Sequence, residues 1–223
     1  MRVSIIVPVL DEAEGIAATL DALVAPRAGG HEVIVVDGGS RDETLALARA
    51  RADTVVEGPR GRARQMNGGA ERAHGEVLLF LHADTRLPKG GVERIVEAVA
   101  GGAGWGRFDV RIAGRSPLLP VVAALMNARS RLTGIATGDQ AMFVRRDLFR
   151  KVGGFPDQPL MEDVELSRRL RATSRPACLR ERVCTSGRRW ENRGVWRTIV
   201  LMWRLRWRYW RGAAADELAR AYR

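Results

Sequence analysis

Short apolar runs alternate with segments of helical spacing through the first hundred residues of the chain. Helical spacing extends from Glu12 to Val24 and from Arg62 to His74, and Pro88 stands near the start of a third such segment that ends at about Ala100. Strands separated by helices of roughly 10–15 residues predict βαβ units and a mainly parallel sheet. The runs that predict strands are 3–9, the first part of 31–40, 52–58 and 76–84.

Acidic residues follow three of these runs. The run at 76–84 is apolar without alternation, which predicts a strand buried on both faces. A glycine turn follows Asp37, and we expect Ser40 to cap the next helix. In open α/β sheets, ligands bind beyond the carboxyl ends of the strands. Asp11, Asp37 and Asp84 are all expected there, which predicts a functional site at that edge.

The second half of the chain is less regular, and it shows no internal repeat or linker. The simplest organisation is one α/β domain over residues 1–193, with a basic helical tail at 194–223. Within the second half we expect a strand at 105–112, a mostly apolar helix at 118–132, a strand and a short helix within 138–155, and a helix at 160–172 that begins with acidic residues and ends with arginine, as the helix dipole favours.

Composition indicates an ordinary globular protein, with 46% hydrophobic and 28% charged residues. The net charge is +11, and residues 186–223 hold seven of these charges, with ten arginines against three acidic residues. Because the basicity is local, no nucleic-acid partner is expected. No apolar run is long enough for a spanning helix, and acidic residues come too early for a secretory signal, so we expect a cytoplasmic protein. Cys178 and Cys184 are interpreted as reduced thiols of the core rather than as a disulfide or metal pair.

The segment 195–211 combines tryptophan and arginine at helical spacing. Basic residues beside a tryptophan-rich stripe are typical of a helix that lies on a membrane surface, here the inner face. The alternative is a helix that packs on the protein itself or on a second copy, with its arginines reaching solvent. Both interpretations stay open. The stripe comprises Trp196, Ile199, Val200, Trp203, Trp207 and Trp210, and Arg197, Arg204, Arg208 and Arg211 run beside it.

Five blocks, in their order and spacing, resemble the family 2 glycosyltransferases over nearly the whole chain. The closest resemblance is to a small soluble branch with VDGGS and LHADT motifs, associated with radical-SAM and selenodomain proteins. It implies a GT-A fold and a metal-dependent, inverting transfer of a sugar from a nucleotide diphosphate. The blocks are IIVPVLDE, VIVVDGGSRDET, GRARQMNGGAERAHGEVLLFLHADT, GDQAMFVRR and MEDVELSRRLR.

The resemblance assigns donor-binding roles to the first three blocks. Gly38 stands where the family usually has a second aspartate. Arg62 precedes a helix, and a helix N-terminus with a flanking arginine attracts phosphate. The residues expected to bind the nucleotide are Pro8, Asp11, Glu12, Asp37, Gly38, Arg62, Gln65 and Asn67.

The segment 82–84 occupies the position of the family's DxD metal motif, with His82 in place of the first acid. A hard divalent cation that bridges the donor phosphates prefers carboxylate oxygen, so Asp84 is the expected ligand together with His82. An imidazole ligand favours Mn²⁺, while Mg²⁺ stays open.

Inversion requires a base that takes the proton of the acceptor. Asp163 matches the family's base, with Glu162 as the alternative about 100° around the helix. The full Gln-x-x-Arg-Trp element of polymerising synthases is absent, which disfavours processive synthesis. The residues expected to line the donor or acceptor pocket are Gly138, Asp139, Gln140, Arg188, Arg189 and Trp190.

Two other functional classes stay open. A nucleotidyltransferase-like enzyme of similar fold is disfavoured because no glycine-rich phosphate loop follows the first strand. A non-catalytic membrane or nucleic-acid adaptor with a decayed site would explain Gly38 and His82, but not the retention of Asp37, Asp84 and Asp163. The sequence leaves open the donor base, the sugar, the acceptor and whether the chain forms a homo-oligomer.

Overall fold

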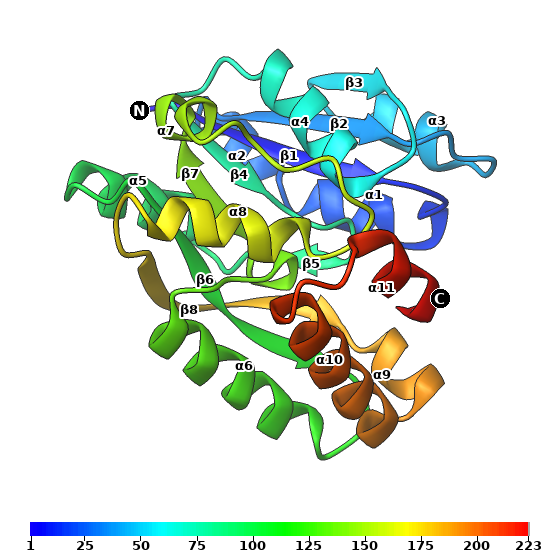
Figure 1. Ribbon diagram of the computed structural model, residues 1–223. Helices are drawn as coiled ribbons and strands as arrows, with labels where there is room; N and C mark the ends of the chain where they lie inside the picture. Colours follow the sequence, from blue (N-terminus) through cyan, green and yellow to red (C-terminus); the bar gives the residue numbers. More distant parts are fainter. Residues whose placement is uncertain (223) are drawn as a thin grey trace.

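The computed structural model describes residues 1–222, and in this range one eight-stranded sheet carries helices on both faces (Figure 1). The strands are β1 (Val3–Val9), β2 (Glu32–Asp37), β3 (Thr54–Glu57), β4 (Val77–Phe80), β5 (Thr85–Arg86), β6 (Trp105–Ala113), β7 (Met142–Arg145) and β8 (Ala177–Ser186). The helices are α1 (Ala13–Asp21), α2 (Val24–Ala28), α3 (Thr44–Arg49), α4 (Arg62–Arg72), α5 (Gly91–Ala100), α6 (Leu119–Thr133), the 3-10 turn η1 (Gly138–Gln140), α7 (Arg146–Lys151), α8 (Glu162–Arg171), α9 (Arg188–Arg193), α10 (Val195–Trp210) and α11 (Ala215–Tyr222).

The strand order is β3-β2-β1-β4-β7-β6-β8-β5. The first four strands in this order pair in parallel, and so do β6 and β8. β7 runs antiparallel to both β4 and β6, and it joins the two halves of the sheet. The expected single α/β domain with a mainly parallel sheet is therefore confirmed.

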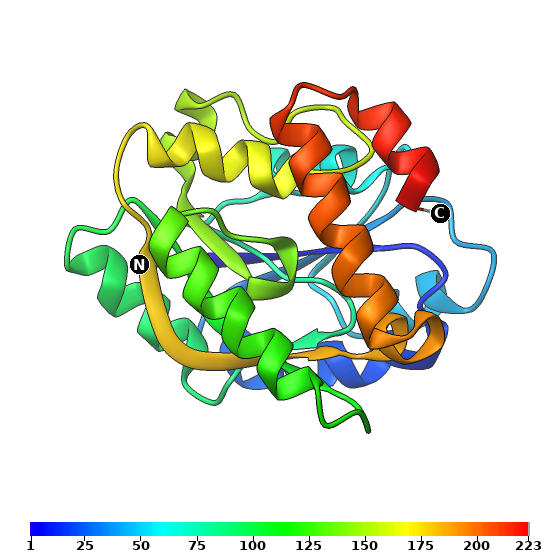
Figure 2. The ribbon, with the colours of Figure 1, turned by 60° about the horizontal axis from the view of Figure 1, so that its bottom comes forward.

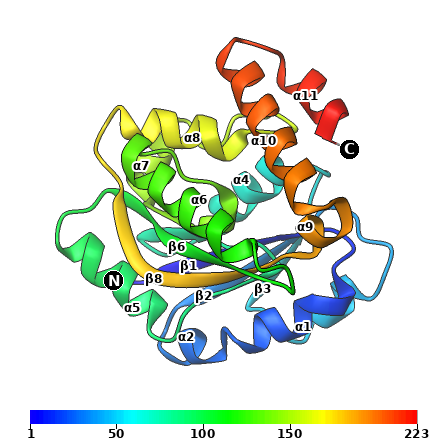
Figure 3. The ribbon, with the colours of Figure 1, turned by 90° about the horizontal axis from the view of Figure 1, so that it is seen from below.

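Apolar side chains fill both faces of the central strands. Alternate residues of one strand serve opposite faces: Ile5 lies in the core under α1 and α5, whereas Ile6 lies in the core under α4, α7 and α8 (Figure 3). Both side chains are fully buried. This two-sided burial explains why the strands read as continuous apolar runs.

Three local expectations were wrong. The helix expected from Glu12 to Val24 is two helices, because a proline at position 26 cannot continue a helix without meeting the carbonyl of residue 22. The strand expected at 76–84 ends at Phe80, and a turn closed by Thr85 N–H on the His82 carbonyl (3.0 Å) follows. Ser40 does not cap a helix: α3 begins at Thr44, and the Ser40 hydroxyl binds Asp37 instead.

The tail returns to the body of the protein. Leu205 of α10 and Leu218 of α11 are buried against Leu160 and Met161, the two residues that precede α8. In residues 1–222, no helix is long and apolar enough to cross a membrane. The two cysteines both lie in β8 and are free, as expected, although each is half-buried.

A buried carboxylate ties three segments together at the amino end of the sheet. Glu32 begins β2 and is 4% exposed. It accepts hydrogen bonds from the Ser4 hydroxyl and from the N–H groups of His74 (2.7 Å) and Gly75 (3.0 Å). Burial alone would raise the pKa of Glu32, but these bonds outweigh burial and lower it.

Glu32→Gln is expected to lower the free energy of unfolding at neutral pH by about 1–2 kcal/mol, because the neutral amide weakens hydrogen bonds that a charged carboxylate accepts and loses the ion pair with Arg2. A lowered pKa in the folded state stabilises the fold above the ordinary glutamate pKa, and this contribution is lost as pH falls through the lowered pKa. Urea unfolding across the acid range should therefore show wild type and variant converging in acid. The exposed Glu71→Gln is the control, and a constant difference at all pH values would contradict this account.

Candidate active site

The charges of four carboxylates from three segments act on Arg62, the first residue of α4. Burial works against the charge of Arg62, but the four carboxylates outweigh it and raise the pKa of this side chain. The nearest is Glu162, with 3.6 Å between Arg62 Nη1 and its Oε1. The structure thus brings together an arginine and acids that lie far apart in the sequence: Glu162, Asp139, Asp163 and Asp84.

Asp139 and His82 form a pair within this group. His82 Nδ1 lies 3.4 Å from Asp139 Oδ1. Partial burial would raise the pKa of Asp139, but the His82 ring, Arg62 and Arg189 lower it. Gly138 makes the close approach possible, since a Cβ at this position would stand 2.3 Å from the His82 ring. Only glycine fits at position 138 of the GDQ segment (138–140), because the ring of His82 in the HAD segment (82–84) lies directly against it.

Asp163 is held against the same turn. Its Oδ2 accepts a hydrogen bond from Gly138 N–H at 2.8 Å, and its Oδ1 accepts one from Val164 N–H at 2.7 Å. The side chain is half-buried, whereas its neighbour Glu162 is 4% exposed. Burial and the Asp163 carboxylate raise the pKa of Glu162, and Arg62 opposes them. Of the two acids, Asp163 is the one with access to a substrate.

Backbone strain is concentrated around this group. Three non-glycine residues have positive φ: Asp11 (53°), Ala141 (45°) and Met161 (65°). Asp11 follows β1, Ala141 follows η1, and Met161 precedes α8. Such conformations persist only where surrounding structure imposes them, and they cluster at functional sites. Met161 is buried in one cluster with Leu205 and Leu218 of the tail.

Asp37 lies at the end of β2, as expected, and is 2% exposed. Its Oδ2 accepts hydrogen bonds from the N–H groups of Gly39 (2.9 Å) and Ser40 (3.0 Å), and its Oδ1 accepts one from the Ser40 hydroxyl. Asp11 joins the same loop, because its Oδ1 accepts the N–H of Arg41 at 2.8 Å. Pro8, near the end of β1, pairs with β2 within the sheet. In this structure the Asp37 carboxylate therefore holds the turn at Gly39 and Ser40, which belongs to the loop expected to bind the nucleoside.

Gln65 explains the glycine at position 38. Its Nε2 donates to the carbonyls of Val9 (2.7 Å) and Val36 (2.8 Å), so that it joins the ends of β1 and β2. A Cβ on Gly38 would lie 3.0–3.1 Å from the Gln65 amide. The second aspartate usual in the family would therefore crowd this buried amide, which would have to shift to admit it.

Asn67 also binds backbone. Its Nδ2 donates to the Phe155 carbonyl at 2.8 Å, and its Oδ1 accepts the Phe155 N–H at 3.0 Å. The structure places Asn67 and Gln65 in bridging positions and only Arg62 of this segment among the carboxylates. That Gln65 and Asn67 also contact the nucleotide stays a prediction.

The Arg188–Trp190 segment lies in α9, opposite the first strand-to-helix turn. Arg188 Nη2 is 3.0 Å from Glu12 Oε2, and the charge of Asp84 also reaches it. Burial and Arg62 lower the pKa of Arg189, against the attraction of Asp139 and Asp84. Trp190 packs on the core. Both arginines therefore lie on the Asp84 side of the site.

Asp84 is a suitable ligand for a divalent cation, but the protein side chains that the structure describes do not form a complete set of ligands around it. In residues 1–222, no group of three or more His, Cys, Asp or Glu side chains is arranged to hold a metal ion. Mg²⁺-like ions are held by one or two carboxylates with phosphate oxygens and waters, so a single carboxylate beside a diphosphate fits. His82 Nε2 is buried without a hydrogen-bond partner, directly beside Gly138. Asp84 is thus the better-placed of the two expected ligands.

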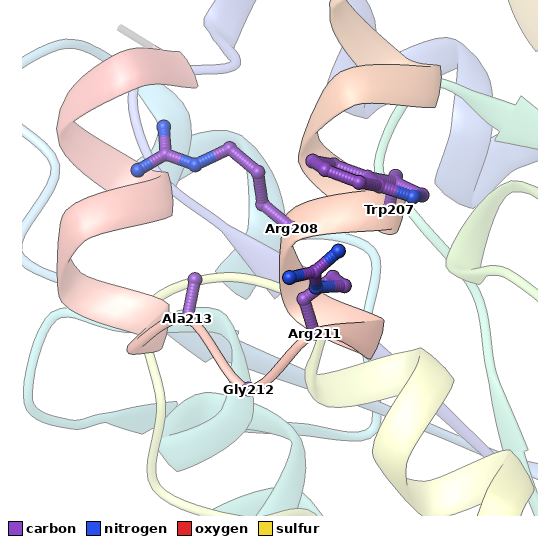
Figure 4. A pocket seen from close by; sticks show the side chains of 5 residues that line it. All are labelled: Trp207, Arg208, Arg211, Gly212 and Ala213. Atoms are coloured by element: carbon purple, nitrogen blue, oxygen red, sulfur yellow. The ribbon is translucent and has the colours of Figure 1, made fainter.

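A shallow hollow elsewhere lies at the end of α10. Figure 4 shows Trp207 and Arg211 on one side of it and Arg208 turned towards α11. The Arg211 guanidinium is 5.1 Å from the centre of the Trp207 ring, and Arg208 pairs with Glu217. The hollow contains none of the carboxylates described above, so we do not assign the donor to it.

The curled α/β sheet and its site define the class of protein, a GT-A fold. The mannosyltransferase PcManGT from Pyrobaculum calidifontis, solved in complex with GDP-Man and Mn²⁺, matches with a TM-score of 0.68 and 23% identity, over 99% of this chain and 68% of that one. An uncharacterized glycosyltransferase of Mycobacterium tuberculosis is 30% identical over 195 residues, which cover 82% of this chain and 73% of the relative.

The sequence profile named Glycosyl transferase family 2 matches residues 4–153. The chain belongs to this family, as the resemblance predicted. A PGL/p-HBAD biosynthesis glycosyltransferase of Mycobacterium bovis is 40% identical over 91 residues, which cover 38% of this chain and 36% of the relative. The match thus spans about a third of that relative's length.

Two residues near Asp163 were not found from the sequence. Arg129 of α6 and Arg206 of α10 lie within the electrostatic reach of Asp163. Arginine inside a helix is most often solvent-exposed, so no pattern distinguished these two from the other arginines of the chain.

Proposed function

We propose that the protein transfers a sugar, with inversion, from a nucleotide diphosphate to an acceptor in a metal-dependent reaction. The observation that carries this proposal is that contacts bring together the HAD, GDQ and MED segments: His82 pairs with Asp139, Gly138 N–H binds Asp163, and Glu162 pairs with Arg62, while the charge of Asp84 also reaches Arg62. Ligands of open α/β sheets bind beyond the carboxyl ends of the strands. Relatives with the family name and a structural neighbour that holds GDP-Man and Mn²⁺ support it.

The residues divide the work by position. Asp163 is the proposed base: it takes the proton of the acceptor hydroxyl as that oxygen bonds to the anomeric carbon and the nucleoside diphosphate leaves. Arg62, Arg188 and Arg189 stabilise the negative charge of the leaving diphosphate. Asp84 would hold the divalent ion, which when bound neutralises phosphate charge. His82 would join it only if its ring turned away from Gly138.

The competing classes are less well supported. A nucleotidyltransferase would not need an acid held as Asp163 is, by Gly138 N–H beside the arginine cluster. An adaptor with a decayed site would not retain strained backbone at Asp11, Ala141 and Met161, since strain costs stability unless it is used. The VDGGS and LHADT motifs support placing the chain in the small soluble branch of the family.

Calorimetry with UDP-, GDP- and dTDP-sugars, with and without Mn²⁺, tests the proposal, and NMR of the released sugar gives the stereochemistry. We expect one donor to bind in a metal-dependent manner and to be slowly hydrolysed to the inverted sugar. A folded protein that bound none of these donors would move support to the adaptor. Release of the sugar with retained configuration would contradict the inverting mechanism alone.

We further propose that the exposed face of α10 rests on an anionic membrane. Trp196, Trp203, Trp207 and Trp210 are each more than half exposed, at 58–81%. Arginines lie beside them, and their charge complements anionic lipid. Vesicles rich in phosphatidylglycerol should bind the protein at low salt and release it at high salt. No binding at low salt would favour contact with a second copy of the chain.

A further inference from the structure

Two half-buried arginines, Arg129 of α6 and Arg206 of α10, hold guanidinium nitrogens that have no partner in the described part of the chain, between helices that flank the site. Nε and Nη2 of Arg129 and Nε of Arg206 are shielded from solvent and have no hydrogen-bond partner within residues 1–222. Neither side chain forms an ion pair there. α6 and α10 lie on either side of the segment that contains η1 and β7 (Figure 2). Buried charges are normally paired, so two such cations indicate a missing anion.

The surroundings of this pair confirm the excess of positive charge. Burial and the nearby charge of Arg206 lower the pKa of Arg129 to about 10. Burial also lowers the pKa of Arg206, against the attraction of Asp163 and Asp139. A third buried arginine, Arg107, is compensated by an ion pair with Asp109. Asp163 attracts both Arg129 and Arg206, but within residues 1–222 neither forms such an ion pair.

The position of the pair separates it from the expected donor diphosphate. Asp84 attracts Arg188 and Arg189, and it also attracts Arg62, on which Glu162, Asp139 and Asp163 act more strongly. Arg206 instead responds to Asp163 and Asp139, and Arg129 to Asp163. The unpaired cations therefore lie on the side of the proposed base, where the acceptor has to enter.

We infer that Arg129 and Arg206 bind a phosphate group of the acceptor, which is then a phosphate ester with a free hydroxyl. This inference rests on the proposed glycosyltransferase activity. The forked guanidinium groups match phosphate oxygens, and two of them fix its orientation. With the phosphate held, the hydroxyl oxygen bonds to the anomeric carbon, the bond from that carbon to the diphosphate breaks, and the hydroxyl proton passes to Asp163.

Thermal unfolding with and without inorganic phosphate tests the binding site first. Phosphate should raise the melting temperature of wild type, and Arg129→Met with Arg206→Met should weaken phosphate binding by about tenfold or more. Without phosphate the double variant should melt no lower than wild type, because it loses unpaired buried charge. Arg220→Met, a change on the exposed surface of α11, should behave as wild type.

Transfer to sn-glycerol 3-phosphate and to phosphatidylglycerol vesicles then distinguishes a soluble ester from a lipid headgroup, with glycerol and phosphatidylcholine vesicles as controls. Transfer to either phosphate ester, lost in the double variant while slow donor hydrolysis persists, is the expected result.

Equal phosphate binding by wild type and the double variant would overturn the inference, and so would equal transfer to glycerol. If wild type neither bound nor hydrolysed any donor, the proposed function itself would have failed. If the double variant does not fold, each single variant and the phosphate response of wild type decide the matter.

Discussion

Asp163→Asn is expected to lower the rate of sugar transfer by about 10²- to 10⁴-fold while donor binding stays unchanged. The amide is nearly the same shape as the carboxylate, and its oxygen can still accept the Gly138 N–H. The geometry of η1 should therefore survive, and what is lost is the ability to take a proton. Initial rates of transfer and calorimetric titration of the donor measure the two effects separately.

Two further variants on α8 make this result specific. Glu165 lies one helical turn away from Glu162 and pairs with Arg168 and Arg169 at the surface, so Glu165→Gln should retain the rate. Glu162→Gln removes the acid that is paired with Arg62. If Glu162→Gln lost the rate and Asp163→Asn kept it, the roles of the two acids would have to be exchanged.

Asp84→Ala is expected to weaken metal-dependent donor binding by about 100-fold, which corresponds to roughly 3 kcal/mol. The reason is that Asp84 is the carboxylate best placed to hold the cation, and the remaining ligands would come from the donor and water. Binding measured with EDTA should be similar for wild type and variant. Calorimetry with and without Mn²⁺ gives both values.

The control for this change is Asp147→Ala, which removes an exposed carboxylate paired only with Arg145 in the nearby turn. It should leave donor binding unchanged. An Asp84→Ala protein that bound the donor as tightly as wild type in Mn²⁺ would show that the cation, if needed, is held elsewhere. His82 and Asp139 would then be the residues to change next.

The parallel half of the sheet was predictable because each of its strands is recognised from the residues of that strand alone. β1, β2 and β4 are buried on both faces, so their apolar runs appear directly in the sequence. The position of Asp37 follows from where its run ends. The error at 76–84 has a tertiary cause: Leu81 N–H still bonds to the Ile6 carbonyl of β1, and the chain then turns at His82–Thr85, within which Asp84 lies.

The site was less predictable where residues act through partners far along the chain. From the sequence, Gly38 suggests the loss of one nucleoside contact. The structure shows that the side-chain amide of Gln65 lies next to the place where a Cβ of residue 38 would be. Asn67 is predicted to bind the nucleotide, and the structure adds that its side chain forms two hydrogen bonds with the Phe155 backbone. In both cases the residue type was informative, but its partner could not be deduced from spacing.

By itself, the sequence determined the α/β class, the family, the strand end that carries Asp37, and the acidic start of α8. Periodicity and motif spacing suffice for these features, because they depend on neighbours within one element. Only the tertiary structure decided that the charges of four carboxylates act on Arg62, that Met161 of the body shares a buried cluster with Leu205 and Leu218 of the tail, and that Arg129 and Arg206 hold unpartnered nitrogens within reach of the Asp163 charge. Burial and electrostatic environment depend on which helices pack together, and that packing brings residues from distant parts of the chain to one site.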